Sequence, residues 1–208
     1  MKALVVYCHP RPNSYTAAVR DTVMDRLSDH GAEIRLIDLY GAGFNPVMTA
    51  DEHEAYEDET ANTRGLEPHI VDLQWCDTLI FVYPTWWYGM PAVLKGWLDR
   101  TLVPGVAFHL PNEMHKNIQP GLPNITRLGV FTTCGASRWL TFMIGSPGRR
   151  TLLRGFRLIC AGRCKTTFAA HYSIDSSTAE SRAAHLAKVA AKMDRFIGPK
   201  PTRQEARA

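Results

Sequence analysis

Short apolar runs alternate along this chain with segments in which apolar residues recur at helical spacing. The run Lys2–Cys8 is continuous and rich in β-branched residues, which predicts a buried parallel strand. From Tyr15 to Leu27 apolar residues recur every four positions. This spacing predicts a helix with its N-cap at Asn13 or Ser14 and its end at Gly31.

The rest of the chain repeats the same alternation of strands and helices. Further strands are predicted over residues 34–38, 78–83, 127–132 and 165–170, the second of these stopping at Pro84. Three more helices are predicted from their start signals: Pro91 at a first helical position, Ser146-Pro147 as cap and first residue of a helix reaching Cys160, and the capping box Ser177-x-x-Glu180.

Five strands that alternate with helices predict an α/β fold, namely a flavodoxin-like, doubly wound five-stranded parallel sheet with helices on both faces. The expected organisation is one domain over residues 1–198 and a flexible C-terminal tail over residues 199–208.

Composition narrows the class of protein. The 208 residues are 45% hydrophobic and 21% charged, as in globular proteins rather than disordered ones. A net charge of +4 is too small to indicate nucleic-acid binding. The five cysteines include no CxxC pair, and no export or membrane-spanning segment is expected, so a cytoplasmic protein is predicted. Cys160, Cys164 and His171 offer too few ligands for a zinc site, and buried thiols are favoured.

Two charged stretches stand out. Six of the nine residues 51–59 are acidic, as in a solvated surface segment. From Arg138 to Lys165 there are seven cationic and no acidic side chains, and Arg150, Arg154 and Arg157 share one helix face. This basic stretch fits a dinucleotide phosphate, a membrane surface, an acidic partner or a plain solvated face.

Ligands of doubly wound sheets bind beyond the carboxyl ends of the strands, so the loops that follow the strands are the candidate site. The first loop lacks a Gly-rich fingerprint but leads into a helix N-terminus, which favours an anion. Asn13, Ser14 and Thr16 supply polar groups there, and His9 a cation. Plain helix capping is the alternative.

The second loop is the most informative one. Pro84-Thr-Trp-Trp-Tyr-Gly-Met-Pro91 places Trp86, Trp87 and Tyr88 in a row, as a stacking platform for a flat ligand or else as a packing or subunit contact.

The third loop, Thr132-Thr-Cys-Gly-Ala136, exposes backbone amides suited to the edge of a heterocycle, and Arg138 adds positive charge. Together the three loops match the phosphate, ring face and polar edge of a flavin.

The run Phe81–Arg100, with Asp38–Pro46 and His9-Pro-x-x-x-Ser14, resembles flavodoxin-like NAD(P)H:quinone oxidoreductases, a family that includes DT-diaphorase-type enzymes and potassium-efflux ancillary oxidoreductases. The resemblance implies a homodimer with flavin at the interface and ping-pong hydride transfer from NADPH or NADH to a quinone-like acceptor. It leaves open an ancillary regulatory flavoprotein that docks on a membrane transporter. FMN is favoured, with FAD as the alternative.

The resemblance also assigns residues. Those that hold the flavin would be His9, Asn13, Ser14, Tyr15, Thr16, Pro84, Thr85, Trp86, Trp87, Tyr88, Thr132, Thr133, Cys134 and Gly135. Tyr88, Phe108 and Arg138 would serve catalysis, with Phe108 lining the acceptor pocket. Leu140 and Ser146 stand where the animal quinone reductases have a tyrosine and a histidine, and Cys134 stands where the family usually has glycine.

Overall fold

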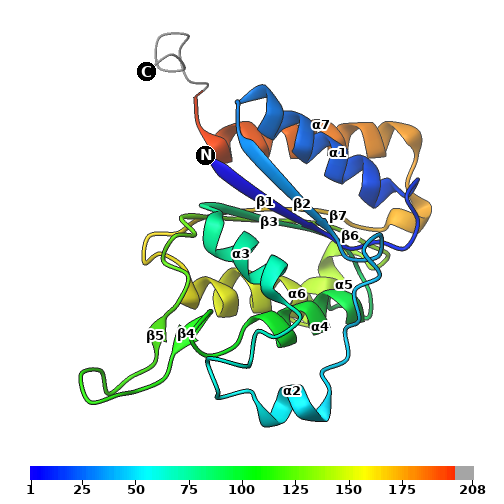
Figure 1. Ribbon diagram of the computed structural model, residues 1–208. Helices are drawn as coiled ribbons and strands as arrows, with labels where there is room; N and C mark the ends of the chain where they lie inside the picture. The colour runs from blue at the N-terminus through cyan, green and yellow to red at the C-terminus, as the bar shows by residue number, and fades with distance from the viewer. Residues whose placement is uncertain (200–208) are drawn as a thin grey trace.

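Five parallel strands form the centre of the molecule, which a computed structural model describes over residues 1–199 (Figure 1). The strands are β1 Lys2–Tyr7, β2 Glu33–Asp38, β3 Thr78–Thr85, β6 Arg127–Cys134 and β7 Lys165–His171. Their order is β2-β1-β3-β6-β7, and every neighbouring pair is parallel. The order reverses at β1 and β3, which confirms the predicted doubly wound, flavodoxin-like sheet.

Helices cover both faces of this sheet (Figure 1). One layer consists of α1 Tyr15–Asp29 and α7 Ala179–Ile197. The other consists of α3 Glu67–Trp75, α4 Ala92–Thr101 and a helical segment that changes type twice, from α6 Pro147–Arg150 through the π-helix Thr151–Gly155 to the 3-10 helix Phe156–Ile159. The smaller elements are α2 Ala50–Glu54, α5 Arg138–Met143, the 3-10 turn Ile174–Ser176 and the hairpin of β4 Phe108–His109 with β5 Gln119–Pro120.

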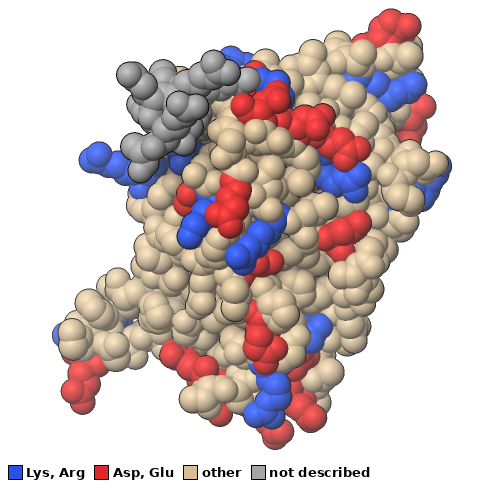
Figure 2. All heavy atoms as spheres, turned by 45° about the horizontal axis from the view of Figure 1, so that its top comes forward, with Lys and Arg blue, Asp and Glu red and all other residues tan. Residues whose placement is uncertain are grey.

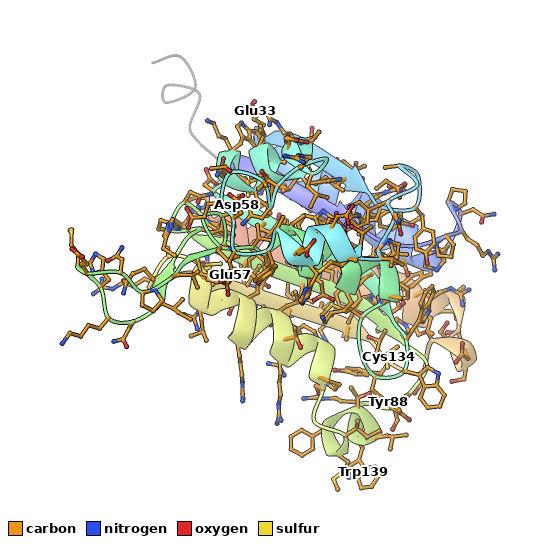
Figure 3. All side chains as sticks on the ribbon, turned by 60° about the horizontal axis from the view of Figure 1, so that its bottom comes forward. Glu33, Glu57, Asp58, Tyr88, Cys134 and Trp139 are labelled. Carbon is orange, nitrogen blue, oxygen red and sulfur yellow. The ribbon has the colours of Figure 1, made fainter. Side chains whose placement is uncertain are left out.

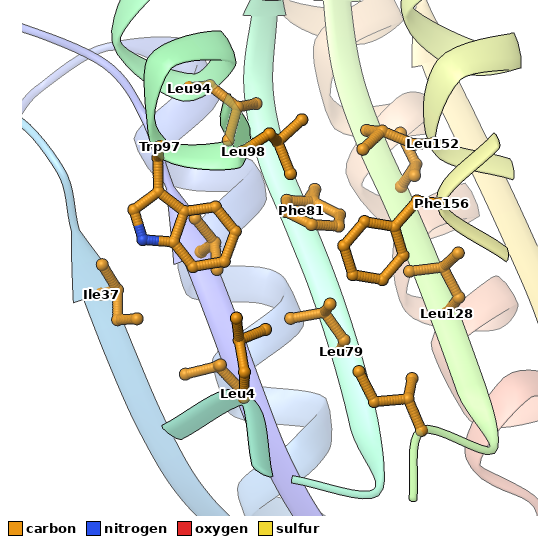
Figure 4. Close-up of a cluster of buried hydrophobic side chains, with 14 of the residues drawn as sticks. Leu4, Ile37, Leu79, Phe81, Leu94, Trp97, Leu98, Leu128, Leu152 and Phe156 are labelled. Carbon is orange, nitrogen blue, oxygen red and sulfur yellow. The ribbon is translucent and has the colours of Figure 1, made fainter. Parts of the chain in front are cut away.

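The alternation of side chains along each strand creates two hydrophobic cores. Leu79 and Phe81 face the layer of α3 and α4, whereas Ile80 between them faces α1 and α7. Figure 4 shows the larger core, in which the Phe81 ring lies edge-on to Trp97 at 6.1 Å and to Phe156 at 5.7 Å between ring centroids. These aromatic contacts fix α4 and the 3-10 helix against the sheet.

Charged side chains of both signs are interspersed on the face shown in Figure 2. Some of them join the helices: Arg26 of α1 binds Asp194 of α7 at 2.8 Å. Within residues 1–199, no helix combines the length and apolar character needed to cross a lipid bilayer.

Several predicted element boundaries were wrong. β3 does not stop at Pro84 but continues to Thr85. The Val82 carbonyl accepts from Cys8 N, so Pro84, two residues on, also faces the β1 side, where β1 has already ended. The missing N–H of Pro84 therefore costs the sheet no bond.

The observed starts of the later helices also differ from the predicted ones. Pro91 is the N-cap of α4 rather than its first residue, and the last capping box pairs Thr178 with Ser181. Ser146 adopts a left-handed conformation with φ 49° and makes no cap bond; its hydroxyl instead donates to the Thr141 carbonyl. The predicted tail falls outside the described residues from position 200 onward.

Candidate functional site

The loops that follow β1, β3 and β6 meet at one edge of the sheet. Figure 3 shows Tyr88, Cys134 and Trp139 at this end, far from Glu33 at the start of β2. Two threonine contacts connect the loops: Thr85 and Thr132 approach to 2.9 Å between hydroxyl oxygens, and Thr16 and Thr133 to 3.2 Å. Because Thr132 and Thr133 point to opposite faces of β6, this strand connects the start of α1 to the end of β3.

The aromatic loop after β3 is a tight turn held in a strained conformation. Trp86 and Gly89 exchange two backbone hydrogen bonds of 3.1 and 3.0 Å, and the two residues between them, Trp87 and Tyr88, have φ of 47° and 61°. This is the geometry of a type I′ turn, which ordinarily uses Asn and Gly. Bulky aromatic residues are strained in this conformation, and such strain clusters at active sites and ligand-binding sites.

Neither tryptophan side chain of this turn is buried against the edge of the sheet. Trp87 is 95% exposed and Trp86 is 41% exposed. Their rings are therefore free to stack on a flat ligand, since large apolar side chains this exposed commonly mark a binding surface. The predicted aromatic platform is thus open rather than self-packed.

The N-terminus of α1 is arranged to receive an anion. Ser14 is the N-cap, and its hydroxyl accepts from Ala17 N at 3.1 Å. The same hydroxyl also lies 3.5 Å from the Tyr7 hydroxyl oxygen. The backbone amides of Tyr15 and Thr16 have no acceptor within residues 1–199. These amides and the helix dipole favour a phosphate group beside Ser14.

His9 lies in the loop before α1, with its ring against the Arg11 backbone. Its Nδ1 lies 3.0 Å from Arg11 N, from which it can accept, and 3.1 Å from the Arg11 carbonyl oxygen, to which a protonated Nδ1 donates. Burial lowers the pKa of His9 below its ordinary value of 6.5, with a smaller contribution from the Arg11 charge. His9 is therefore neutral at pH 7 and offers one N–H.

A shallow pocket lies beside the aromatic turn. It is lined by Tyr83, Thr85, Tyr88, Thr132, Cys134, Thr141, Ser146, Gly148, Arg149, Phe168, Ala170 and Tyr172. Its volume is about 20 Å³, so a tricyclic ring has to lie across its mouth rather than inside it. Four predicted site residues line this ring pocket: Thr85, Tyr88, Thr132 and Cys134.

Several pocket residues were missed from the sequence. Tyr172 is the first residue after β7, so the rule that ligands bind in loops after strands could have identified it. Arg149 was recognised only as part of the basic stretch. Tyr172 and Arg149 line the ring pocket together with Ser146, whereas Leu140 does not. Burial raises the pKa of the Tyr172 phenol, which keeps it a hydrogen-bond donor.

Tyr15, Arg138 and Phe108 are among the predicted residues that do not line the ring pocket. The Tyr15 hydroxyl is turned toward α7, where it donates to the Arg182 carbonyl at 2.9 Å and contacts His185 Nδ1 at 2.9 Å. Arg138 lines a neighbouring groove together with Arg149 and Tyr172.

Phe108 lines a different, apolar pocket, which contains Tyr56 and Phe156 and shares no lining residue with the ring pocket. Phe108 and Tyr88 are therefore not brought together within one chain.

The sequence matches the family model described as flavodoxin-like fold over residues 1–197. This chain belongs to the flavodoxin-like fold family. Among curated relatives, it is 34% identical to the ribosyldihydronicotinamide dehydrogenase [quinone] of Pongo abelii over 141 residues, which are 58% of this chain and 59% of that protein. It is 32% identical to an uncharacterized NAD(P)H oxidoreductase of Haemophilus influenzae over 163 residues, 77% and 78% of the two chains.

This flavodoxin-like chain spans between half and three fifths of the length of the first curated relatives that it matches. Solved structures agree along nearly the whole chain. Smu.1420 from Streptococcus mutans superposes with a TM-score of 0.82 at 28% identity, covering 94% of this chain and 100% of that one. An NAD(P)H:quinone oxidoreductase from Methanothermobacter marburgensis superposes with a TM-score of 0.79 at 23% identity, covering 93% and 97%, and so supports the fold alone.

Proposed function

We propose that this protein is a flavin-dependent oxidoreductase that uses NAD(P)H to reduce quinones or similar electrophiles. When bound, flavin accepts a hydride from NAD(P)H and passes it to the acceptor. The observation that carries the proposal is the strained, exposed Trp87–Tyr88 turn beside an anion-binding helix N-terminus. The names of the curated relatives, which include quinone dehydrogenases and NAD(P)H oxidoreductases, support the same activity.

Each loop then has one task. The Ser14 hydroxyl, the amides of Tyr15 and Thr16 and the neutral His9 ring hold the flavin phosphate, and Asn13 assists them. Pro84, Thr85, Trp86, Trp87 and Tyr88 lie along the ring system and exclude water from one of its faces. Thr132, Thr133, Cys134 and Gly135 meet its polar edge.

Charge at that edge is balanced by Arg149 and by the Tyr172 phenol, which both line the ring pocket. Arg138, in the adjoining groove, adds a second positive charge.

The acceptor pocket requires a second copy of the chain. Phe108 lies in an apolar pocket separate from the ring pocket of its own chain, so it reaches an acceptor above the ring only from a partner. The shallow ring pocket also needs a cover to exclude water. We therefore propose a homodimer in which Phe108 of one protomer faces Tyr88 of its partner.

FMN is the proposed cofactor and the cytoplasm the proposed location. All five cysteines are buried free thiols, as suits a reducing compartment. The pigment is identified by acid extraction and mass measurement, which distinguishes FMN from FAD.

The activity is tested on the purified protein without added cofactor. We expect a yellow protein whose visible absorbance is bleached by NADPH or NADH under anaerobic conditions and restored by a quinone. A protein that takes up neither FMN nor FAD during reconstitution would refute the proposed function. Size-exclusion chromatography with light scattering tests the dimer.

A further inference from the structure

A groove lined by four arginines opens beside the ring pocket, and only Arg149 among them has a place in the function proposed so far. Arg149, Arg150, Arg154 and Arg157 line it, and its volume is about 340 Å³. The other lining residues are Phe142, Gly145, Ser146, Leu153 and Thr166, so no carboxylate is present in it. This arginine groove is therefore wholly cationic.

Its guanidinium groups are not neutralised by the protein. Within residues 1–199, Arg149, Arg150 and Arg154 form no ion pair or hydrogen bond through their side chains. Arg149 lies over the Phe168 ring at 4.8 Å, and Arg157 donates to the Cys164 carbonyl at 3.1 Å. Figure 3 shows nitrogen-tipped side chains that extend into open space from the helical segment after α5.

Such a cluster is costly without an anion, because like charges at helical spacing repel one another. On the face shown in Figure 2, by contrast, acidic and basic side chains are interspersed. Arg150, Arg154 and Arg157 instead follow one another at intervals of four and three residues, which places them along one side of the helix over about 10 Å. A row of this length suits a ligand with more than one phosphate group.

The arginine groove adjoins the ring pocket. Ser146 and Arg149 line both of them. A ligand with a flat ring at one end and phosphates at the other can therefore place its ring beside Tyr88 and its phosphates among the arginines. A nicotinamide dinucleotide has this form, and the proposed function already requires one as its hydride donor.

The side chains of the groove also favour NADPH over NADH. Sites for NADH commonly use a carboxylate to bind the ribose 2′-hydroxyl, whereas arginine accommodates the 2′-phosphate of NADPH. This groove has arginines and no carboxylate. We propose that it binds the phosphates of NADPH, with the 2′-phosphate among Arg150, Arg154 and Arg157, and makes NADPH the preferred donor. This inference rests on the proposed function for the identity of the ring site.

Binding is tested first without turnover, by calorimetry on the purified protein. We expect 2′,5′-ADP to bind at least tenfold more tightly than 5′-AMP, and its affinity to fall as salt is raised. The double variant Arg150→Gln/Arg154→Gln should lose this difference. Arg163→Gln removes an exposed arginine outside the groove and should retain it.

Steady-state kinetics provide the second test. In the double variant the KM for NADPH should rise at least tenfold and by a larger factor than the KM for NADH, while kcat stays within twofold of its starting value. The flavin content should be unchanged, because a drop in bound FAD would show that the groove holds the flavin's own pyrophosphate, which overturns the inference. Co-sedimentation with phosphatidylglycerol vesicles and pull-down of an acidic protein test the other anions.

The outcomes separate the two proposals. If the protein turns over but binds 2′,5′-ADP no better than 5′-AMP, the inference is wrong and the proposed function stands. If 2′,5′-ADP binds through Arg150 and Arg154 but no flavin is bound, the groove is a nucleotide site and the proposed function fails. Arginine-dependent binding to vesicles or to an acidic protein without any preference for 2′,5′-ADP would also overturn the inference.

Discussion

Replacing Trp87 with asparagine separates folding from function at the aromatic turn. Trp87 occupies the first central position of a type I′ turn at φ 47°, where Asn is the preferred residue. The left-handed conformation costs an ordinary residue about 1–2 kcal/mol, and Asn tolerates it better. Because Trp87 is 95% exposed, the substitution sacrifices almost no burial. We expect Trp87→Asn to raise the free energy of unfolding by about 1 kcal/mol.

The same change should weaken flavin binding. A stacked ring contributes about 1 kcal/mol beyond its buried area, which corresponds to about a fivefold higher Kd. Stability is measured by urea denaturation of flavin-free protein followed by circular dichroism, since bound ligand would itself stabilise the fold. Flavin Kd is measured by fluorescence quenching.

The matched control is Trp87→Ala, which removes the ring but keeps a residue that is strained at this φ. It should weaken flavin binding as much as Trp87→Asn without the gain in stability. If the two variants are equally stable, the turn stores no strain that asparagine relieves. If both bind flavin as tightly as the unaltered protein, Trp87 does not contact the ring.

Three further changes test the anion site, the fold and its pH dependence. Ser14→Asp keeps a good N-cap but repels phosphate, so the visible absorbance of the purified variant should show that flavin is lost. Its free energy of unfolding should stay within about 0.5 kcal/mol of the unaltered protein, and the control Ser14→Thr should retain flavin. Gly96→Ala places a Cβ 2.2 Å from the Pro46 carbonyl oxygen and should cost about 1–3 kcal/mol in urea denaturation, whereas Gly155→Ala, which has open space, should not destabilise. Burial lowers the pKa of His185 to about 4, with help from the His171 and Lys188 charges. The unfolded chain therefore binds a proton first as pH falls below 6.5, and the free energy of unfolding should drop by about 3 kcal/mol towards pH 4, a slope that His185→Phe should flatten.

The sheet could be predicted from the sequence because its strands are buried on both faces. Continuous apolar runs such as Lys2–Tyr7 have no competing explanation, and the predicted strands over 127–132 and 165–170 each fall within an observed strand. The helix α3 was missed because its buried apolar residues, Ile70 and Leu73, are too few to establish a period.

The candidate site was predictable to the extent that strand order determines it. The carboxyl ends of β1, β3 and β6 lie side by side in any sheet of this order, so their loops meet without knowledge of the side chains. The position of the helical segment over 147–159 follows from no such rule. Its packing depends on Leu152 and Phe156 meeting Phe81 in the core, and that contact places Arg149 beside Tyr88.

The loops placed by strand order and the helical segment placed by core packing together determine the electrostatics of the site. The loops that the topology brings together carry no acidic side chain over 84–90 and 132–138, and the packed helical segment adds arginines to the same edge. The Asp175 carboxylate lies near Gly135 at this edge, but the arginine groove itself has no carboxylate, and each added guanidinium in it raises the repulsion among the others. Strain at Trp87 and Tyr88 and uncompensated charge at Arg149 and Arg150 are thus two costs borne at one edge of the sheet. An anionic ligand neutralises the charge of the arginines, and a flat ligand stacks on the exposed ring of the strained turn. A single ligand that is both flat and anionic therefore explains the strained turn and the uncompensated arginines together.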